Sequence, residues 1–201
     1  MFNYEGKVVF ITGASSGLGK QMAKGFAEQG ADLVITARRL DKLEELAEEI
    51  RSMGVKCLPV QCDVTKTDVE EYGKIDVLVN NAGSSKAGAV NELSDEDWQF
   101  TIDIDLTSVF KVTREVSNVM IDNGYGRIIN IASMYGILGT NQQASAYHAA
   151  KAAVINFTKA AAAELAPHGI NVNAICPGYF TTELTEETLT TDDFKGYMDI
   201  T

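Results

Sequence analysis

The first forty residues constrain the fold more than any other part of the chain. A run of β-branched residues at 7–12 predicts a buried strand, and it leads into a glycine-rich turn, GASSGLG, at 13–19. An amphipathic helix is predicted at 20–29, closed by Gly30. Glycines allow a tight turn and a close approach of the backbone to a pyrophosphate, and a helix N-terminus offers free N–H groups. The sequence therefore predicts a dinucleotide site.

Strands and helices continue to alternate after this turn. Strands are predicted at 7–12, 32–37, 56–62, 75–80, 127–133 and 170–176, and helices at 20–29, 40–53, 94–123 and 145–165. Such alternation is typical of a parallel sheet with helices on both faces. The helix at 94–123 is expected to bend or break near Asp105. A length of 201 residues suits a single domain over 1–201.

A tyrosine and a lysine one helical turn apart are the strongest candidates for chemistry. Tyr147 and Lys151 share a helix face, and a nearby cation is expected to lower the pKa of a tyrosine from about 10 toward neutral pH. Ser133 lies fourteen residues earlier, at the end of a predicted strand. Its hydroxyl could polarise a carbonyl beside the phenol. The three residues predict an acid/base site.

Five motifs together resemble the short-chain dehydrogenase/reductase family. They are TGASSGLG at 12–19, NNAG at 80–83, Ser133, Tyr147-x-x-x-Lys151 and Pro177-Gly178. The resemblance runs over about 6–184. It implies a Rossmann-type, doubly wound parallel sheet in three α/β/α layers, a nicotinamide cofactor, hydride transfer on a small-molecule substrate, and a homotetramer or homodimer.

The resemblance also implies the residues that hold the cofactor. They are Gly13, Ser15, Ser16, Gly17, Leu18, Gly19, Arg38, Arg39, Asp63, Val64, Asn81, Ala82, Gly83, Tyr147, Lys151, Pro177, Gly178 and Thr182. An acid after the second strand normally holds the ribose of NAD. Ala37 takes that place here, and Arg38 and Arg39 follow it. Guanidinium groups suit a 2′-phosphate, so NADP(H) is the predicted cofactor.

The implied reaction is reduction of a ketone, or its reverse. Tyr147 would donate the proton, Ser133 would hydrogen-bond the developing alkoxide, and Lys151 would hold the nicotinamide ribose and lower the pKa of Tyr147. The family usually has an asparagine where this chain has Asp105. That asparagine anchors a water leading to the lysine. Asp105 is expected to hold the water too, while its charge favours a protonated Lys151.

The substrate is predicted from two segments. The segment 134–143 includes Asn141, Gln142 and Gln143, a polar rim that suits a hydroxylated substrate. The segment 177–184 resembles that of gluconate 5-dehydrogenases and related sugar-acid reductases. Two alternatives stay open: a 3-oxoacyl-[acyl-carrier-protein] reductase, and a regulatory module that binds the dinucleotide without turnover.

Composition excludes several other classes. The formal net charge of −11 disfavours nucleic acid and anionic membranes as partners. No apolar run reaches eighteen residues, so no membrane span is predicted. Three cysteines without Cys-x-x-Cys spacing predict thiols in a reducing cytoplasm, and no metal site is predicted.

Two stretches depart from the pattern. Only ten residues, 65–74, join two strands that the resemblance sets on either side of two others. A parallel crossover that includes a helix usually needs at least about ten to twelve residues. The chain also stops at Thr201, where family members usually continue into a helix and a last strand. Both the crossover and the C-terminus are therefore expected to be shortened or incomplete.

Overall fold

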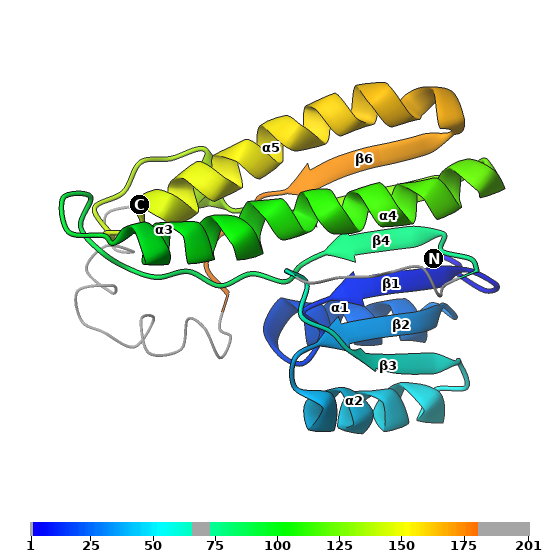
Figure 1. The fold of residues 1–201 in the computed structure, drawn as a ribbon. Coiled ribbons are helices and arrows are strands. Elements are labelled where there is room, and N and C mark those ends of the chain that lie inside the picture. Colours follow the sequence, from blue (N-terminus) through cyan, green and yellow to red (C-terminus); the bar gives the residue numbers. More distant parts are fainter. Residues whose placement is uncertain (1, 66–72, 181–201) are drawn as a thin grey trace.

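A wholly parallel sheet of six strands forms the centre of the computed structural model, which describes residues 2–65 and 73–180. The strands are β1 (Val8–Thr12), β2 (Asp32–Ala37), β3 (Cys57–Gln61), β4 (Val77–Asn80), β5 (Gly126–Ile131) and β6 (Ile170–Ile175). Their order is β3-β2-β1-β4-β5-β6, which can be followed from β3 at the bottom of Figure 1 to β6 at the top. This order confirms the predicted doubly wound sheet, and the reversal between β1 and β4 is where such sheets bind ligands.

Helices cover both faces of the sheet (Figure 1). They are α1 (Gly17–Glu28), α2 (Leu40–Ser52), α3 (Asp95–Ile102), α4 (Ser108–Asn123) and α5 (Ser145–Leu165). A hydrophobic core lies on each face of the sheet, and the side chains of β1 point alternately into one core and the other. Val9 and Ile11 pack in the core that includes residues of α1 and α2. Phe10 points the other way, into the core beneath α4 and α5. Successive side chains of a strand face opposite sides, so one buried strand supplies both layers.

Helix α1 begins earlier than its predicted start at residue 20. Its first residue is Gly17, and Ser16 precedes it in extended conformation. The prediction was wrong because glycine is compatible with both a turn and a helix, so three glycines in seven residues do not mark where the turn ends. The earlier start puts Leu18 and Gly19 in the first turn, where backbone N–H groups have no partner within the helix.

The long helix predicted at 94–123 is broken close to Asp105, as expected. Ser94 caps α3, because its side chain accepts a hydrogen bond from the N–H of Asp97 at 3.1 Å. A five-residue π turn, Asp103–Thr107, then joins α3 to α4. The π geometry is shown by the hydrogen bond from the Ser108 N–H to the carbonyl of Asp103, five residues earlier. Single π turns of this kind are frequent at functional sites.

Two predictions fall on residues that the structure does not describe. Strands β3 and β4 do lie on either side of β2 and β1, but residues 66–72 between them in the sequence lie outside the described residues. The segment 181–201 lies outside them too, and with it the predicted cofactor residue Thr182. Among the helices in the described ranges, none is long and apolar enough to cross a membrane.

A buried chain of polar side chains ties the sheet to α4 and α5. The amide nitrogen of Asn80 donates to Asn130 at 2.9 Å and to Thr113 on α4 at 3.0 Å. Asn130 in turn donates to Thr158 on α5 at 2.9 Å. All four residues are buried, so each bond replaces a lost bond to water. This hydrogen-bond network fixes the helix that carries Tyr147 against β4 and β5.

We expect Asn130→Ala to lower the free energy of unfolding by about 3 kcal/mol, because it leaves a small cavity and removes partners of Asn80 and Thr158. Urea unfolding measures this loss. Asn171→Ala is the matched control, since Asn171 is exposed on β6, and a change within about 0.5 kcal/mol is expected there. Equal stability of both variants would contradict a structural role for the network.

Candidate active site

One cleft of about 1050 Å³ lies at the carboxyl ends of the strands. The predicted residues that line it are Gly13, Ser15, Ser16, Gly17, Leu18, Arg38, Arg39, Asp63, Val64, Asn81, Ala82, Gly83, Ser133, Tyr147, Lys151, Pro177 and Gly178. Gly19 is buried beneath the cleft, and Asp105 is buried behind it. The cleft is also lined by four residues that were not predicted as site residues: Ser84, Phe100, Ile104 and Phe180.

The glycine turn leaves space that any side chain would fill. Gly13 has φ +68°, and a Cβ atom there would lie 2.7 Å from the Cα atom of Ala82. A Cβ atom at Gly19 would meet the carbonyl oxygen of Gly13 and lie 2.5 Å from the side-chain nitrogen of Asn81. The turn, the start of α1 and the loop after β4 are therefore packed backbone to backbone. Such a cradle fits the pyrophosphate of a dinucleotide.

Thr12 and Asn81 hold this cradle together. The hydroxyl oxygen of Thr12 accepts hydrogen bonds from the N–H groups of Asn81 at 2.9 Å and Ala82 at 3.0 Å. The side chain of Asn81 donates back to the carbonyls of Thr12 and Gly13, at 3.0 and 3.1 Å. Thr12 was not among the predicted site residues. Its place at the head of TGASSGLG was the available signal.

The end of the cleft beyond β2 carries positive charge. Arg38 and Arg39 are exposed there, directly after the buried Ala37. A terminal nitrogen of Arg39 donates to the hydroxyls of Ser16 at 2.9 Å and Ser15 at 3.2 Å. Arg38 and Arg39 and the glycine turn therefore form one continuous surface. An anion bound there would contact guanidinium groups and hydroxyls.

At the same end of the cleft, Asp63 makes a local turn. Its carboxylate accepts from the N–H and the hydroxyl of Thr65, at 3.1 and 2.8 Å. Val64 between them is buried. Both predicted residues line the cleft, and the turn holds the chain after β3 against it.

The opposite end brings together the three predicted catalytic residues. Ser133 is buried just after β5, and its hydroxyl oxygen accepts from the N–H of Tyr135 at 3.2 Å. The ammonium of Lys151 lies 5.4 Å from the ring centre of Tyr147 and donates to the carbonyl of Ile131 at 3.1 Å. Phenol, hydroxyl and ammonium thus meet where the strands β4 and β5 end.

The predicted lowering of the Tyr147 pKa was wrong. Burial raises the pKa of this phenol above its usual value, and burial outweighs the other effects. Lys151 lowers the pKa, as predicted, and a hydrogen bond with Ser133 lowers it too, but the charge of Asp105 raises it. The free protein therefore holds Tyr147 as a neutral phenol at neutral pH.

Asp105 contacts Lys151 directly. Its Oδ1 atom lies 2.8 Å from the Lys151 ammonium, and the two side chains are 0% and 5% exposed. The other carboxylate oxygen accepts from the N–H of Ser84 at 3.3 Å. The contact of Oδ1 with the Lys151 ammonium is an ion pair. Burial raises the pKa of the Asp105 carboxyl, and Lys151 opposes this rise.

Gly83 leaves room for this ion pair. A Cβ atom at Gly83 would lie 2.7 Å from Oδ1 of Asp105 and 3.5 Å from the Lys151 ammonium. The sequence had placed the NNAG backbone beside the cofactor, and the structure adds this second reason for a glycine there. The ammonium of Lys151 and Oδ1 of Asp105 are in direct contact, and the water that Asp105 is expected to hold stays a prediction.

His148 packs beside the site. Its ring stacks on Tyr135, with centroids 4.5 Å apart, and its Nδ1 atom donates to the carbonyl of Ala144 at 2.7 Å. Tyr135 in turn shares a hydrogen bond of 2.7 Å with the hydroxyl of Tyr179. This stack supports the ring of Tyr147, which meets Tyr135 edge to face.

The predicted polar rim is mixed in character. Asn141, Gln142 and Gln143 are exposed, as expected. Ile137 and Leu138, in the same segment, are also exposed, by 68% and 53%. The sequence interpretation considered only the polar half of this segment.

Comparison with known proteins agrees with this geometry. Residues 7–193 match the family model of short chain dehydrogenases. A 3-oxoacyl-[acyl-carrier-protein] reductase from Synechocystis sp. is 41% identical over 190 residues, which cover 90% of this chain and 76% of that protein.

Two solved structures have closely similar folds. A short-chain dehydrogenase/reductase from Mycobacterium marinum superposes with a TM-score of 0.91 at 40% identity, covering 99% of this chain and 82% of that one. A candidate NAD(P)-dependent gluconate 5-dehydrogenase from Beutenbergia cavernae, with NADP bound at low occupancy, gives a TM-score of 0.91 at 32% identity, with the same coverage.

Proposed function

The chain belongs to the short-chain dehydrogenase family, and we propose that it interconverts a ketone and a secondary alcohol with NADP(H) as cofactor. One observation carries the proposal: Ser133, Tyr147 and Lys151 line one end of a cleft whose other end is lined by Arg38 and Arg39. When bound, NADPH supplies the hydride that the carbonyl carbon receives.

The protein's own residues handle the oxygen and the proton. In reduction, the phenol of Tyr147 donates its proton to the carbonyl oxygen as negative charge develops there. The Ser133 hydroxyl donates a hydrogen bond to the same oxygen, and Lys151 supplies a fixed positive charge nearby. Because burial keeps the pKa of Tyr147 raised, the donor form is present at neutral pH. Asp105 acts through Lys151.

The cleft fits a dinucleotide phosphate in two respects. The glycine cradle leaves the backbone of 13–19 open to a pyrophosphate, since side chains at Gly13 and Gly19 would collide with backbone. Arg38 and Arg39 follow β2 where an acid would favour NAD. The cradle suits either dinucleotide, and the two arginines support NADP(H) over NAD(H).

We expect Arg38→Asp to lower kcat/KM for NADPH by about 10- to 100-fold, since it removes a charged hydrogen bond to phosphate and adds repulsion. Activity with NADH should be kept or improved, because the new carboxylate can accept from a ribose hydroxyl. Lys42→Asp, the same charge change at an exposed site on α2, is the control. An equal loss with both cofactors would contradict a role for Arg38 in phosphate recognition.

For the substrate, we propose a polar ketone of the sugar-acid class. The exposed Asn141, Gln142 and Gln143 support it, and so does the similarity to the Beutenbergia cavernae protein. A 3-oxoacyl thioester is the second candidate. The exposed Ile137 and Leu138 favour it, together with the 41% identity to a 3-oxoacyl reductase.

The test is a screen of 5-ketogluconate, related keto-sugars and 3-oxoacyl thioesters, each with NADPH and with NADH. Highest kcat/KM for a keto-sugar acid with NADPH supports the proposal. Preference for a thioester supports the second candidate. Tight NADPH binding without turnover of any ketone would leave a non-catalytic dinucleotide-binding module instead.

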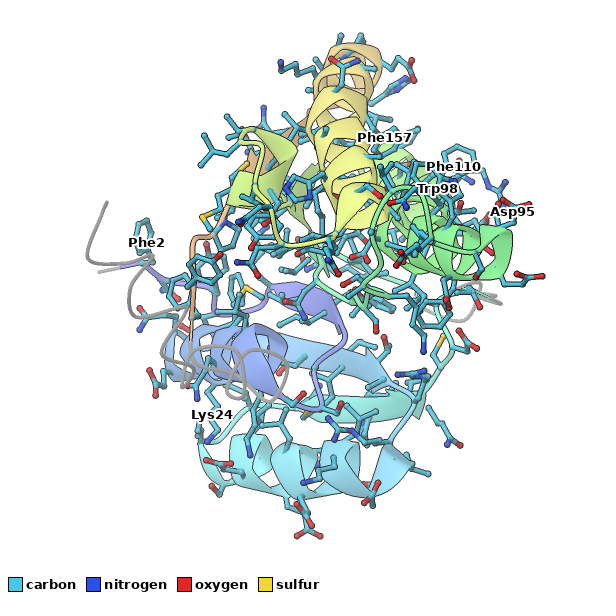
Figure 2. The ribbon with its side chains drawn as sticks, turned by 90° about the vertical axis from the view of Figure 1, so that its left-hand side faces the viewer. Phe2, Lys24, Asp95, Trp98, Phe110 and Phe157 are labelled. Carbon is cyan, nitrogen blue, oxygen red and sulfur yellow. The ribbon has the colours of Figure 1, made fainter. Side chains whose placement is uncertain are left out.

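We further propose that the chain assembles as a homodimer or homotetramer through α4 and α5. Phe110 and Phe157 meet edge to face, with ring centres 6.3 Å apart, and Phe110 is 45% exposed. Trp98 on α3 lies on the same side of the molecule (Figure 2). A second copy of this chain would cover these rings, and light scattering measures the mass.

The remaining assignments are proposals of the same kind. Cys57 and Cys176 are thiols, which supports the reducing cytoplasm as the location. Burial raises the pKa of the Cys57 thiol to about 11, so it is unreactive. A net charge of −11 supports small molecules, not nucleic acid, as ligands.

A further inference from the structure

The buried pair of Asp105 and Lys151 is arranged to hold charge in a fixed place. The ammonium has three N–H groups, of which one donates to the Ile131 carbonyl while the Asp105 carboxylate lies 2.8 Å away. The Asp105 carboxylate also accepts a hydrogen bond from the N–H of Ser84, and the backbone of Gly83 packs against it. Neither side chain can turn away without leaving a buried charge without its partner, which is costly.

This arrangement changes what Lys151 does to Tyr147. An isolated ammonium beside a phenol stabilises the phenolate, because opposite charges attract. A carboxylate in contact with the ammonium cancels much of that field at the phenol. The two charges together act as a dipole, whose effect falls off faster with distance than that of one charge.

We propose that Asp105 is a positioning residue that sets the pH at which Tyr147 changes from proton donor to proton acceptor, by offsetting the charge of Lys151. The inference rests on the proposed function and deepens it. Reduction of a ketone uses the neutral phenol, whereas oxidation of an alcohol uses the phenolate. Asp105 therefore extends the pH range of reduction upward and moves the rise of oxidation to higher pH.

The groups facing Tyr147 come from four elements. Lys151 lies on its own helix, Ser133 follows β5, Asp105 belongs to the π turn, and Tyr135 lies in the short turn after Ser133. Of these four, Lys151 and Asp105 form an ion pair, with 2.8 Å between the ammonium and the carboxylate. Removing the charge of Asp105 should therefore shift the titration of Tyr147 in one direction, to lower pH.

Asp105→Asn is the decisive change. Asparagine has the same shape and keeps an oxygen for Lys151, but it lacks the negative charge. We expect the titration of Tyr147 to move down by about one pH unit. The ultraviolet absorbance of tyrosinate measures it, as the difference between each protein and its Tyr147→Phe counterpart. The rising limb of alcohol oxidation with NADP⁺ should move down by the same amount.

Asp103→Asn is the matched control, because it removes the same charge two residues away. The Asp103 side chain is partly exposed and bonds to Gln99 at 2.8 Å, not to Lys151. Solvent screens its charge, so its removal should move the titration much less. Urea unfolding of both variants checks that they are folded. A titration that stays in place, moves up, or moves equally in both variants would overturn the inference.

The absorbance titration needs neither substrate nor cofactor, so the two proposals can fail separately. If no ketone is turned over but Asp105→Asn lowers the Tyr147 titration, the proposed function fails and the role of Asp105 stands. If ketones are reduced but the titration does not respond to Asp105, the proposed function stands and this inference fails.

Discussion

A Tyr147→Phe variant is expected to lose about 10²- to 10⁴-fold in turnover, because it removes the proton donor. Phenylalanine fills the same space and keeps the edge-to-face contact with Tyr135, whose ring centre lies 6.0 Å away. Ser133 and Lys151 stay in place. Affinity for NADPH, measured by its fluorescence, should therefore change little while steady-state turnover falls.

Tyr135→Phe provides the control for this loss. It removes a phenol hydroxyl at a neighbouring ring, one that is hydrogen-bonded to Tyr179 at 2.7 Å. A much smaller loss is expected, since this hydroxyl is not in the cleft wall. If Tyr147→Phe turned over ketones at the unmodified rate, the phenol could not be the donor.

The second large effect is expected from Gly13→Ala, which should cost about 3 kcal/mol of stability and abolish tight NADPH binding. Two penalties add: a left-handed φ of +68° disfavours alanine, and its Cβ atom would lie 2.7 Å from the backbone of Ala82. The clash at Ala82 is with a backbone atom, which cannot move aside as the end of a flexible side chain could. Urea unfolding and NADPH titration measure the two losses.

Gly25→Ala in the same region is predicted to have the opposite sign. Gly25 lies inside α1, is exposed, and a Cβ atom there would meet nothing within 4 Å. Alanine should stabilise the helix by about 0.5–1 kcal/mol. Similar effects of the two substitutions would mean that Gly13 is not under steric constraint.

The sequence predicted what depends on local pattern. Alternating segments predicted the parallel sheet, and the family resemblance implied its order. Each described motif residue implied for the cofactor except Gly19 lines the cleft. The start of α1 was missed because glycine is compatible with both turn and helix. The role of Thr12 was missed because its partners, Asn81 and Ala82, are far away along the chain.

The electrostatics of the site could not be predicted in the same way. The pKa of Tyr147 depends on how deeply the ring is buried, which is a result of packing between elements. The contact between Asp105 and Lys151 joins residues 46 positions apart and depends on the π turn. A spacing of four residues showed that Lys151 is near Tyr147, but not that a carboxylate offsets its charge.

The π turn has a consequence for comparing this chain with its relatives. A π turn holds one more residue than an α turn, so the extra residue is absorbed there and the helix on each side keeps its buried face. Thr101 before the turn and Val112 after it are both buried. Deleting one residue within Asp103–Thr107 would return this turn to α geometry and shift Asp105 relative to Lys151, so an alignment gap at this point signals a changed site, not a neutral loop change.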